Sequence, residues 1–140
     1  MSVESNITTV RRWVDEAWNH GDFSSAATMY TPTYFLHNPQ QSFDSVEALK
    51  GFISMMRGAM PDLHMEIEDI FGNGEKVAWR FSVTGTHTGG LLLGVPATGK
   101  AVTNWGLLIS QFKDGKWAVD ECQWDALGTL QTLGVIPVMG

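Results

Sequence analysis

The stretch LHMEIEDIFGNGEKVAWRFSVTG, residues 63–85, decides the fold class. Two segments that alternate apolar and polar side chains flank Gly72-Asn73-Gly74, and glycine and asparagine accept the positive φ angles of a tight turn. The stretch therefore predicts a β-hairpin. In its second arm one set of alternate residues is apolar and should face a core: Val77, Trp79, Phe81 and Val83.

A second pair of alternating segments follows, at residues 101–112 and 116–125 around Asp114-Gly115, so the C-terminal half predicts a four-stranded antiparallel meander. The segment TYFLHNP, residues 33–39, predicts a strand that joins its edge.

The N-terminal half has helical periodicity instead. Three helices are expected: residues 6–20 ending at Gly21, a shorter one over 22–30 capped by Asp22, and a third from the Asp44/Glu47 capping box to Pro61. Helices first and sheet afterwards indicate an α+β fold.

The connection between the two hairpins, GTHTGGLLLGVPATGK at residues 85–100, is unusually apolar for a loop. Adjacent leucines at 91–93 are expected to cover something rather than lie in water. We interpret residues 89–95 as a flap over a pocket or a partner.

Composition limits the partners. The 140 residues carry a net charge of −6, which disfavours both nucleic acid and anionic membrane surfaces as partners. The single Cys122 permits no internal disulfide, and the sequence shows neither a signal peptide nor an apolar run of membrane-spanning length. We expect one cytoplasmic domain over residues 1–140 that takes a neutral hydrophobic ligand.

The last strand offers a catalytic carboxyl. If strict alternation holds, the face that begins with Trp117 and Val119 continues through Glu121, Gln123 and Asp125. This face either emerges into water or lines a cavity. The leucines that follow favour a packed environment, and burial disfavours the charged form of a carboxyl, which suits proton transfer near neutral pH.

We therefore predict Asp125 as the acid/base residue with Glu121 and Gln123 beside it. His37 is a possible support, although a lone strand histidine is more often structural.

Aromatic and methionine side chains from the helices and strands should converge on one interior. They form either a filled core or the walls of a pocket for a flat polycyclic ligand, and the predicted pocket residues are Trp13, Phe52, Met56, Trp79, Phe81 and Trp105. The histidines lie on separate elements without metal-ligand spacing, and no phosphate-binding glycine motif is present, so neither a metal nor another cofactor is expected.

Four segments resemble the SnoaL-like polyketide cyclase family in that family's order: PDLHMEIEDI at 61–70, GTHTG at 85–89, GVPATGK at 94–100 and DGKWAVDECQWDALGTLQTLG at 114–134. The resemblance implies the nuclear transport factor 2-like fold, a cone in which a curved sheet encloses a pocket beneath helices. It also implies an intramolecular aldol cyclisation without a metal. The family's acid/base aspartate maps onto Asp125, and His37, His87 and Trp105 map onto pocket or motif positions.

The sequence departs from the family pattern at Val119-Asp120-Glu121, where relatives commonly have Glu-His-Trp. A second carboxyl at Glu121 allows a related reaction such as isomerisation. Three functions therefore stay open: a cyclase-type enzyme, a small-molecule-binding protein of the same fold, and an epoxide or ester hydrolase, which would need Arg80 beside Asp125. The polar sheet face with Arg80, Ser82 and Thr84 predicts a homodimer or higher homo-oligomer.

Overall fold

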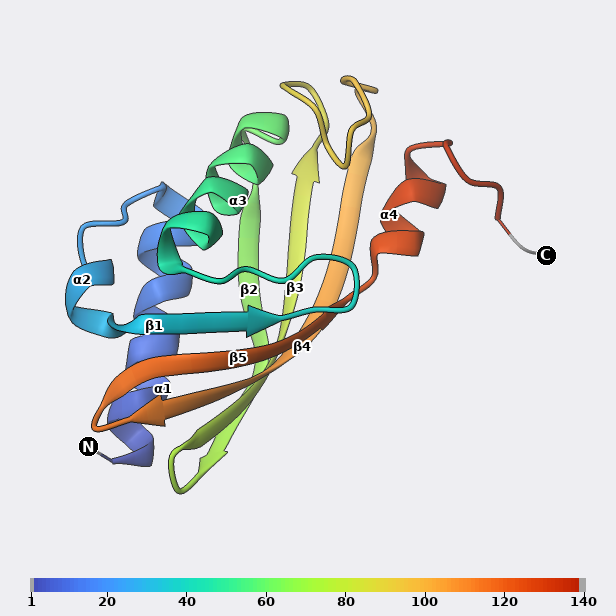
Figure 1. Cartoon of the computed structure of the whole chain (residues 1–140). Coiled ribbons are helices and arrows are strands. Elements are labelled where there is room, and N and C mark those ends of the chain that lie inside the picture. The colour runs from blue at the N-terminus through green and yellow to red at the C-terminus, as the bar shows by residue number, and fades with distance from the viewer. Residues whose placement is uncertain (1, 139–140) are drawn as a thin grey trace.

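The computed structural model describes residues 2–138 and has an α+β architecture, as predicted. A strongly bent five-stranded sheet is covered on one side by helices (Figure 1). The strands are β1 (Tyr30–His37), β2 (His64–Asn73), β3 (Lys76–Thr86), β4 (Ala101–Lys113) and β5 (Lys116–Trp124). The helices are α1 (Val3–Trp13), α2 (Ala26–Met29), α3 (Val46–Ala59) and α4 (Ala126–Thr132).

The sheet has the order β1-β5-β4-β3-β2. The four C-terminal strands pair antiparallel with their neighbours in sequence, which confirms the predicted meander. β1 lies parallel to β5 and brings Leu36 beside Asp120, so the predicted strand does join the edge. The meander and its added edge strand thus form one continuous inner face.

An extra residue in β5 changes which side chains point inward. Gln111 of β4 pairs with Val119, but the next residue, Phe112, pairs with Trp117, so Ala118 forms a β-bulge. A bulge shifts the alternation by one residue. Trp117 and Asp120 are consequently both buried, whereas Glu121 is exposed.

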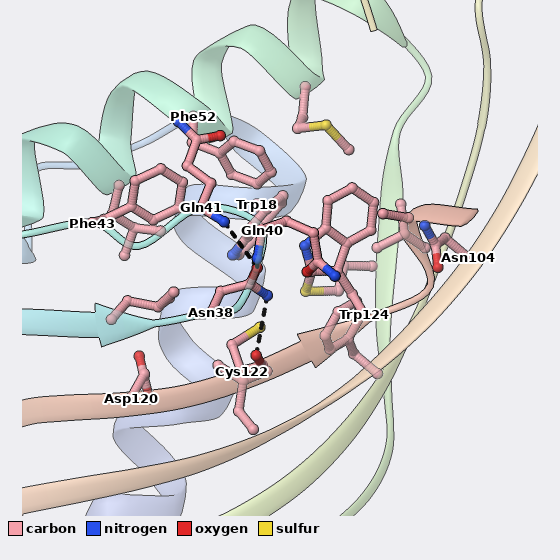
Figure 2. Close-up of a pocket in the computed structure, with 18 of the residues that line it drawn as sticks. Trp18, Asn38, Gln40, Gln41, Phe43, Phe52, Asn104, Asp120, Cys122 and Trp124 are labelled. Atoms are coloured by element: carbon pink, nitrogen blue, oxygen red, sulfur yellow. Dashed lines mark hydrogen bonds between the residues drawn. The ribbon is translucent and has the colours of Figure 1, made fainter. Parts of the chain in front are cut away.

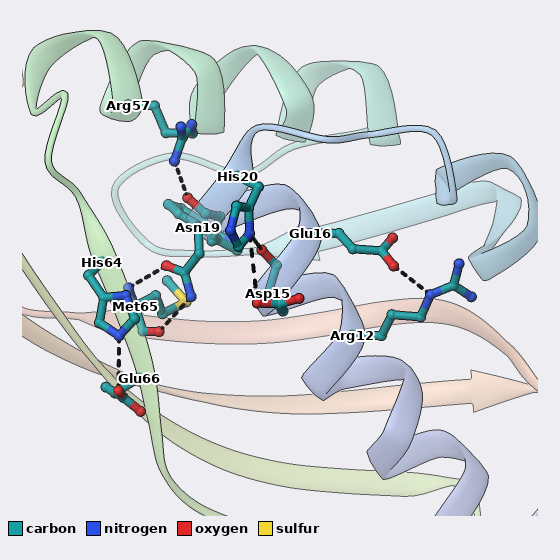
Figure 3. Close-up of polar contacts among 10 residues, drawn as sticks. Arg12, Asp15, Glu16, Asn19, His20, Arg57, His64, Met65 and Glu66 are labelled. Atoms are coloured by element: carbon teal, nitrogen blue, oxygen red, sulfur yellow. Dashed lines mark hydrogen bonds and ion pairs between the residues drawn. The ribbon is translucent and has the colours of Figure 1, made fainter.

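The first helix is irregular at its end. α1 continues into a π-helical turn at Val14–Trp18, and the chain turns away at Gly21, which has the expected left-handed backbone with φ of 68°. Asn19 then pairs with the backbone of Met65 through two hydrogen bonds, and Arg57 of α3 donates to the Trp18 carbonyl at 2.8 Å (Figure 3). These contacts join the helix end to β2 and α3.

The two other predicted helices start later than expected. α2 has only four residues, and Asp22 instead accepts a hydrogen bond from the Ser24 backbone. Ser45, not Asp44, caps α3 by accepting from the Ala48 backbone at 3.1 Å. Among the described residues, no helix has the length and apolar character that a membrane span needs.

Candidate active site

A cavity of about 310 Å³ lies between the inner face of the sheet and the helices. Its deep end is lined by residues that are almost fully buried: Trp13, Tyr30, Trp79, Trp117 and Asp120. The exposed side chains of Gln40 and Gln41 mark its mouth, with α4 and the flap at residues 89–95, here called the leucine loop, nearby. The volume falls in the range of small-molecule sites.

Aromatic rings form much of the wall near the mouth. Phe52 of α3 lies with its ring centroid 5.1 Å from Phe43, 6.2 Å from Trp18 and 6.4 Å from Trp124. Figure 2 shows Phe43 and Phe52 near α3, with Asp120, Cys122 and Trp124 on β5. Broad aromatic walls favour a flat, largely apolar ligand.

The leucine loop contributes to the cavity as expected. Leu92 is fully buried, and both Leu92 and Leu93 line the cavity. The loop is fastened to the end of α3, because Gly89 and Gly90 donate backbone hydrogen bonds to the carbonyls of Ala59 and Gly58. The loop therefore closes one side of the chamber.

Asp120 is the only carboxyl among the described residues that line this cavity. It is 1% exposed, and it accepts three hydrogen bonds: from Ser110 Oγ at 2.5 Å, from Trp117 Nε1 at 2.8 Å and from the Tyr34 hydroxyl at 2.5 Å. Trp79 Nε1 in turn donates to Ser110 Oγ at 2.9 Å. These donors fix the orientation of the carboxyl group.

Burial raises the pKa of Asp120 to about 6, although the donors Ser110, Tyr34 and Trp117 partly oppose the rise. A carboxyl with this pKa exists in both protonation states near neutral pH, so it can accept a proton and return it. Burial also raises the pKa of the neighbouring Cys122 to about 12, which keeps this thiol protonated and unreactive.

The expected inward position of Asp125 is wrong. Asp125 is exposed and is the N-cap of α4, where its side chain accepts a hydrogen bond from the Gly128 backbone at 2.8 Å. A Cβ atom on Gly128 would collide with the Asp125 carboxyl, so the glycine makes this cap possible. The Asp-Ala-Leu-Gly segment thus has a structural explanation as a helix start.

Three other predicted residues come together on the opposite face of the sheet. His37, Glu121 and Gln123 are exposed and line a depression on the outer surface, and His37 pairs with Glu121 in the parallel β1–β5 register. The bulge at Ala118 explains the error for Glu121 and Gln123, because strict alternation had placed them inside.

Trp105 and His87 also lie outside the cavity. Trp105 is 51% exposed on the outer face of β4, whereas the adjacent Gly106 is buried on the inner face together with Val102 and Leu108. His87 is fully buried in its own loop: Nε2 lies 2.9 Å from the Gly90 carbonyl, which can only accept, and Nδ1 accepts from the Thr98 backbone at 3.3 Å. His87 therefore holds the loop in shape.

Five predicted pocket residues do line the cavity: Trp13, Phe52, Met56, Trp79 and Phe81. Their role in binding a substrate stays a prediction.

Arg80 is exposed on the outer face, and no arginine lines the cavity in the described part of the chain, so the arrangement needed for the predicted hydrolase alternative is not formed. Within residues 2–138, no three His, Cys, Asp or Glu side chains gather as metal ligands would.

Sequence reasoning missed Asp120, Tyr30, Tyr34, Asn38 and Trp124. Asp120 was hidden by the bulge, and Tyr30 was assigned to a helix although it begins β1. Asn38 donates to the Cys122 carbonyl at 3.0 Å and accepts from the backbone of Gln40 and Gln41, so it shapes the mouth. The Asn-Pro pair in this turn was the one available signal.

Comparison with known proteins agrees with this architecture. The family model of the SnoaL-like polyketide cyclases matches residues 8–133, and the chain belongs to this family. It is 30% identical to the aklanonic acid methyl ester cyclase DnrD of Streptomyces peucetius over 94% of this chain and 92% of the relative. It is 31% identical to the cyclase DauD of Streptomyces sp. strain C5, over 91% and 81%.

The crystal structure of AclR from Streptomyces galilaeus, a candidate hydroxylase, matches with a TM-score of 0.85 and 27% identity, over 99% of this chain and 87% of AclR. These matches confirm the predicted family, the predicted α+β fold and the predicted polyketide cyclase class.

Proposed function

We propose that this chain acts as one domain over residues 1–140 and catalyses an intramolecular aldol cyclisation, or a related isomerisation, of a hydrophobic carbonyl-bearing ring compound. Asp120 takes the acid/base role that the sequence had assigned to Asp125. One observation carries the proposal: a buried carboxyl with a raised pKa stands at the deep end of an aromatic cavity.

The proton balance of this reaction needs only one carboxyl. The Asp120 carboxylate accepts a proton from a carbon next to a substrate carbonyl, which leaves an enolate. The enolate carbon attacks a second carbonyl of the same molecule, and a carbon–carbon bond forms. Asp120 then returns its proton to the resulting alkoxide, so the reaction neither consumes a co-reactant nor changes an oxidation state.

The surroundings of Asp120 suit both halves of this cycle. Its pKa of about 6 leaves most of the carboxyl ionised at neutral pH, ready to accept the proton. The apolar walls exclude water from the enolate, which strengthens electrostatic interactions inside the cavity. The chain therefore supplies the proton acceptor, holds it in a fixed orientation and excludes water from the cavity.

The names of the relatives supply the first compound to test. DnrD and DauD are aklanonic acid methyl ester cyclases, and a methyl ester has the carbonyl group that the proposed chemistry requires. Product formation from aklanonic acid methyl ester should be followed for wild type and Asp120→Asn.

We expect Asp120→Asn to lower kcat by about 10²- to 10⁴-fold, the usual contribution of a general acid/base residue. Its affinity for the compound should stay within a few-fold of wild type. If the wild-type chain binds the compound tightly and converts none of it or its ring-bearing analogues, the alternative of a non-catalytic binding protein holds instead.

We also propose that the protein is a cytoplasmic homodimer that pairs through the outer face of the sheet. Trp105, Leu107 and Ile109 are alternate residues on the outer face of β4, each about half exposed, and they form an apolar stripe that a second copy would cover. Size-exclusion chromatography with light scattering tests this. A mass near 31 kDa, twice the 15.4 kDa chain, is expected, and a 15.4 kDa species at micromolar concentration would contradict it.

A further inference from the structure

The aromatic ring of Tyr30 is held on three sides at the deep end of the cavity. It stacks on Trp117 with ring centroids 5.0 Å apart and 17° between the planes, and it meets Trp13 and Tyr34 edge to face at 5.0 and 4.7 Å. The side chain is 4% exposed and lines the cavity. Because the ring is packed on three sides, it has little freedom to reorient its hydroxyl.

The hydroxyl of Tyr30 is buried and has no hydrogen-bond partner within residues 2–138. Leaving a buried hydroxyl unpaired costs about 1–3 kcal/mol. Phenylalanine would pack in the same place without this cost. The other unpaired buried hydroxyl in the described part of the chain, that of Thr31, belongs to a residue that does not line the cavity.

Tyr34 provides an internal contrast. Its hydroxyl is fully engaged in donating to Asp120 Oδ2, so it has no second proton to offer a ligand. The hydroxyl of Tyr30 has its proton free, and burial together with the charge of Asp120 raises the pKa of Tyr30 well above its usual value. It is therefore a hydrogen-bond donor that stays protonated.

We propose that the Tyr30 hydroxyl donates a hydrogen bond to a carbonyl oxygen of the bound ligand, and that it stabilises the charge that develops on this oxygen when Asp120 removes the neighbouring proton. The catalytic half of this inference rests on the proposed function, whereas the binding half does not. The ligand class is accordingly a flat ring compound with a ketone oxygen at the end that enters first.

Tyr30→Phe removes only the hydroxyl, so it separates this role from packing. The probes are 2-acetylnaphthalene and 2-isopropenylnaphthalene, which have nearly the same shape. The first has a carbonyl oxygen where the second has a methylene group. Quenching of tryptophan fluorescence gives the affinity of each. Wild type should prefer the ketone, and Tyr30→Phe should reduce this preference about tenfold, the worth of one hydrogen bond.

Tyr34→Phe is the matched control, since it also loses one phenol hydroxyl but one that is already paired. It should keep the ketone preference. The inference is overturned if wild type shows no preference for the ketone, or if Tyr30→Phe retains the wild-type preference.

In the cyclisation assay, Tyr30→Phe should lower kcat by about 100- to 1,000-fold, as the loss of a single oxyanion donor does. The pH midpoint of its rate should stay where it is in wild type, because Asp120 keeps all three donors. A wild-type kcat in Tyr30→Phe would overturn the catalytic half. Activity that survives in Asp120→Asn would instead overturn the proposed function. In that case the ratio of the affinities for the ketone and the alkene probe would still decide whether Tyr30 binds a carbonyl oxygen.

Discussion

The hydroxyl of Tyr34 donates a 2.5 Å hydrogen bond to Oδ2 of Asp120, and the two residues lie on adjacent parallel strands, 86 positions apart in the chain. This contact links the edge strand β1 to the carboxyl in the cavity. It also opposes the effect of burial, because a donor to the carboxylate lowers the pKa of Asp120.

Tyr34→Phe should therefore shift the pH dependence of the reaction. Without this donor the pKa of Asp120 rises above its value of about 6, so a higher pH is needed to form the reactive carboxylate. The midpoint of kcat against pH should move up by about one to two units, given that a hydrogen bond to a charged group contributes about 1.5–3 kcal/mol. A downward shift would contradict the assignment of Asp120 as the base.

Asp120 should also make the protein less stable as the pH rises from about 4 to about 6. The ordinary pKa of 3.8 applies to the unfolded chain, and the folded value is about 6, so in this window the folded state binds more protons than the unfolded state. The free energy of unfolding then decreases with rising pH, by about 3 kcal/mol for a difference of two units.

Urea unfolding of wild type and Asp120→Asn at several pH values checks this slope. The groups with lowered pKa, such as Glu16 and Asp62, act in the opposite direction and are the same in both proteins. The difference between the two proteins should change across pH 4–6 and be flat above pH 7. A constant difference throughout would show that Asp120 does not titrate there.

Asp125 should act as a helix cap and not in the reaction. Asp125→Ala removes the acceptor for the Gly128 backbone and should cost about 1 kcal/mol of stability, whereas Asp125→Asn keeps a good cap and should be nearly neutral. Thermal unfolding measures both. Equal losses in the two variants would contradict the capping role.

Gly106 should be essential to the shape of the cavity wall. A Cβ atom there would lie 2.5 Å from Phe81 Cζ and 2.7 Å from the Gln123 carbonyl, and the strand carbonyl has little room to move. Gly106→Ala should destabilise the protein by about 1–3 kcal/mol.

Gly51→Ala is the matched control for this substitution. Nothing lies within 4 Å of its added Cβ on α3, so the change should stabilise the protein by up to about 1 kcal/mol through helix propensity. A neutral Gly106→Ala in denaturant unfolding would mean that Phe81 is free to move aside.

The fold was largely predictable because turn chemistry and periodicity agree. Gly72-Asn73-Gly74 and Asp114-Gly115 mark the two hairpins, and Gly21 marks the end of the first helix. The family resemblance points to the same architecture, and the matches to the cyclases confirm it. The leucine loop was also understood correctly from its composition, since Leu92 is buried against the cavity.

The inward position of Asp120, the proposed acid/base residue, was not predictable by alternation. A single inserted residue, Ala118, reverses the faces of β5, and no turn or glycine marks it in the sequence. On β4 the apolar residues Trp105 and Leu107 point outward, while Gly106 faces in because the Phe81 ring fills its place. In both strands, packing between elements overrides the local pattern.

The direct test compares cyclisation by Asp120→Asn and Asp125→Asn, two identical chemical changes five residues apart, under one set of conditions. We expect kcat to fall by at least 100-fold in Asp120→Asn and to stay within about twofold of wild type in Asp125→Asn. Loss of activity in Asp125→Asn with activity retained in Asp120→Asn would contradict the account and return the reaction to the residue at the start of α4.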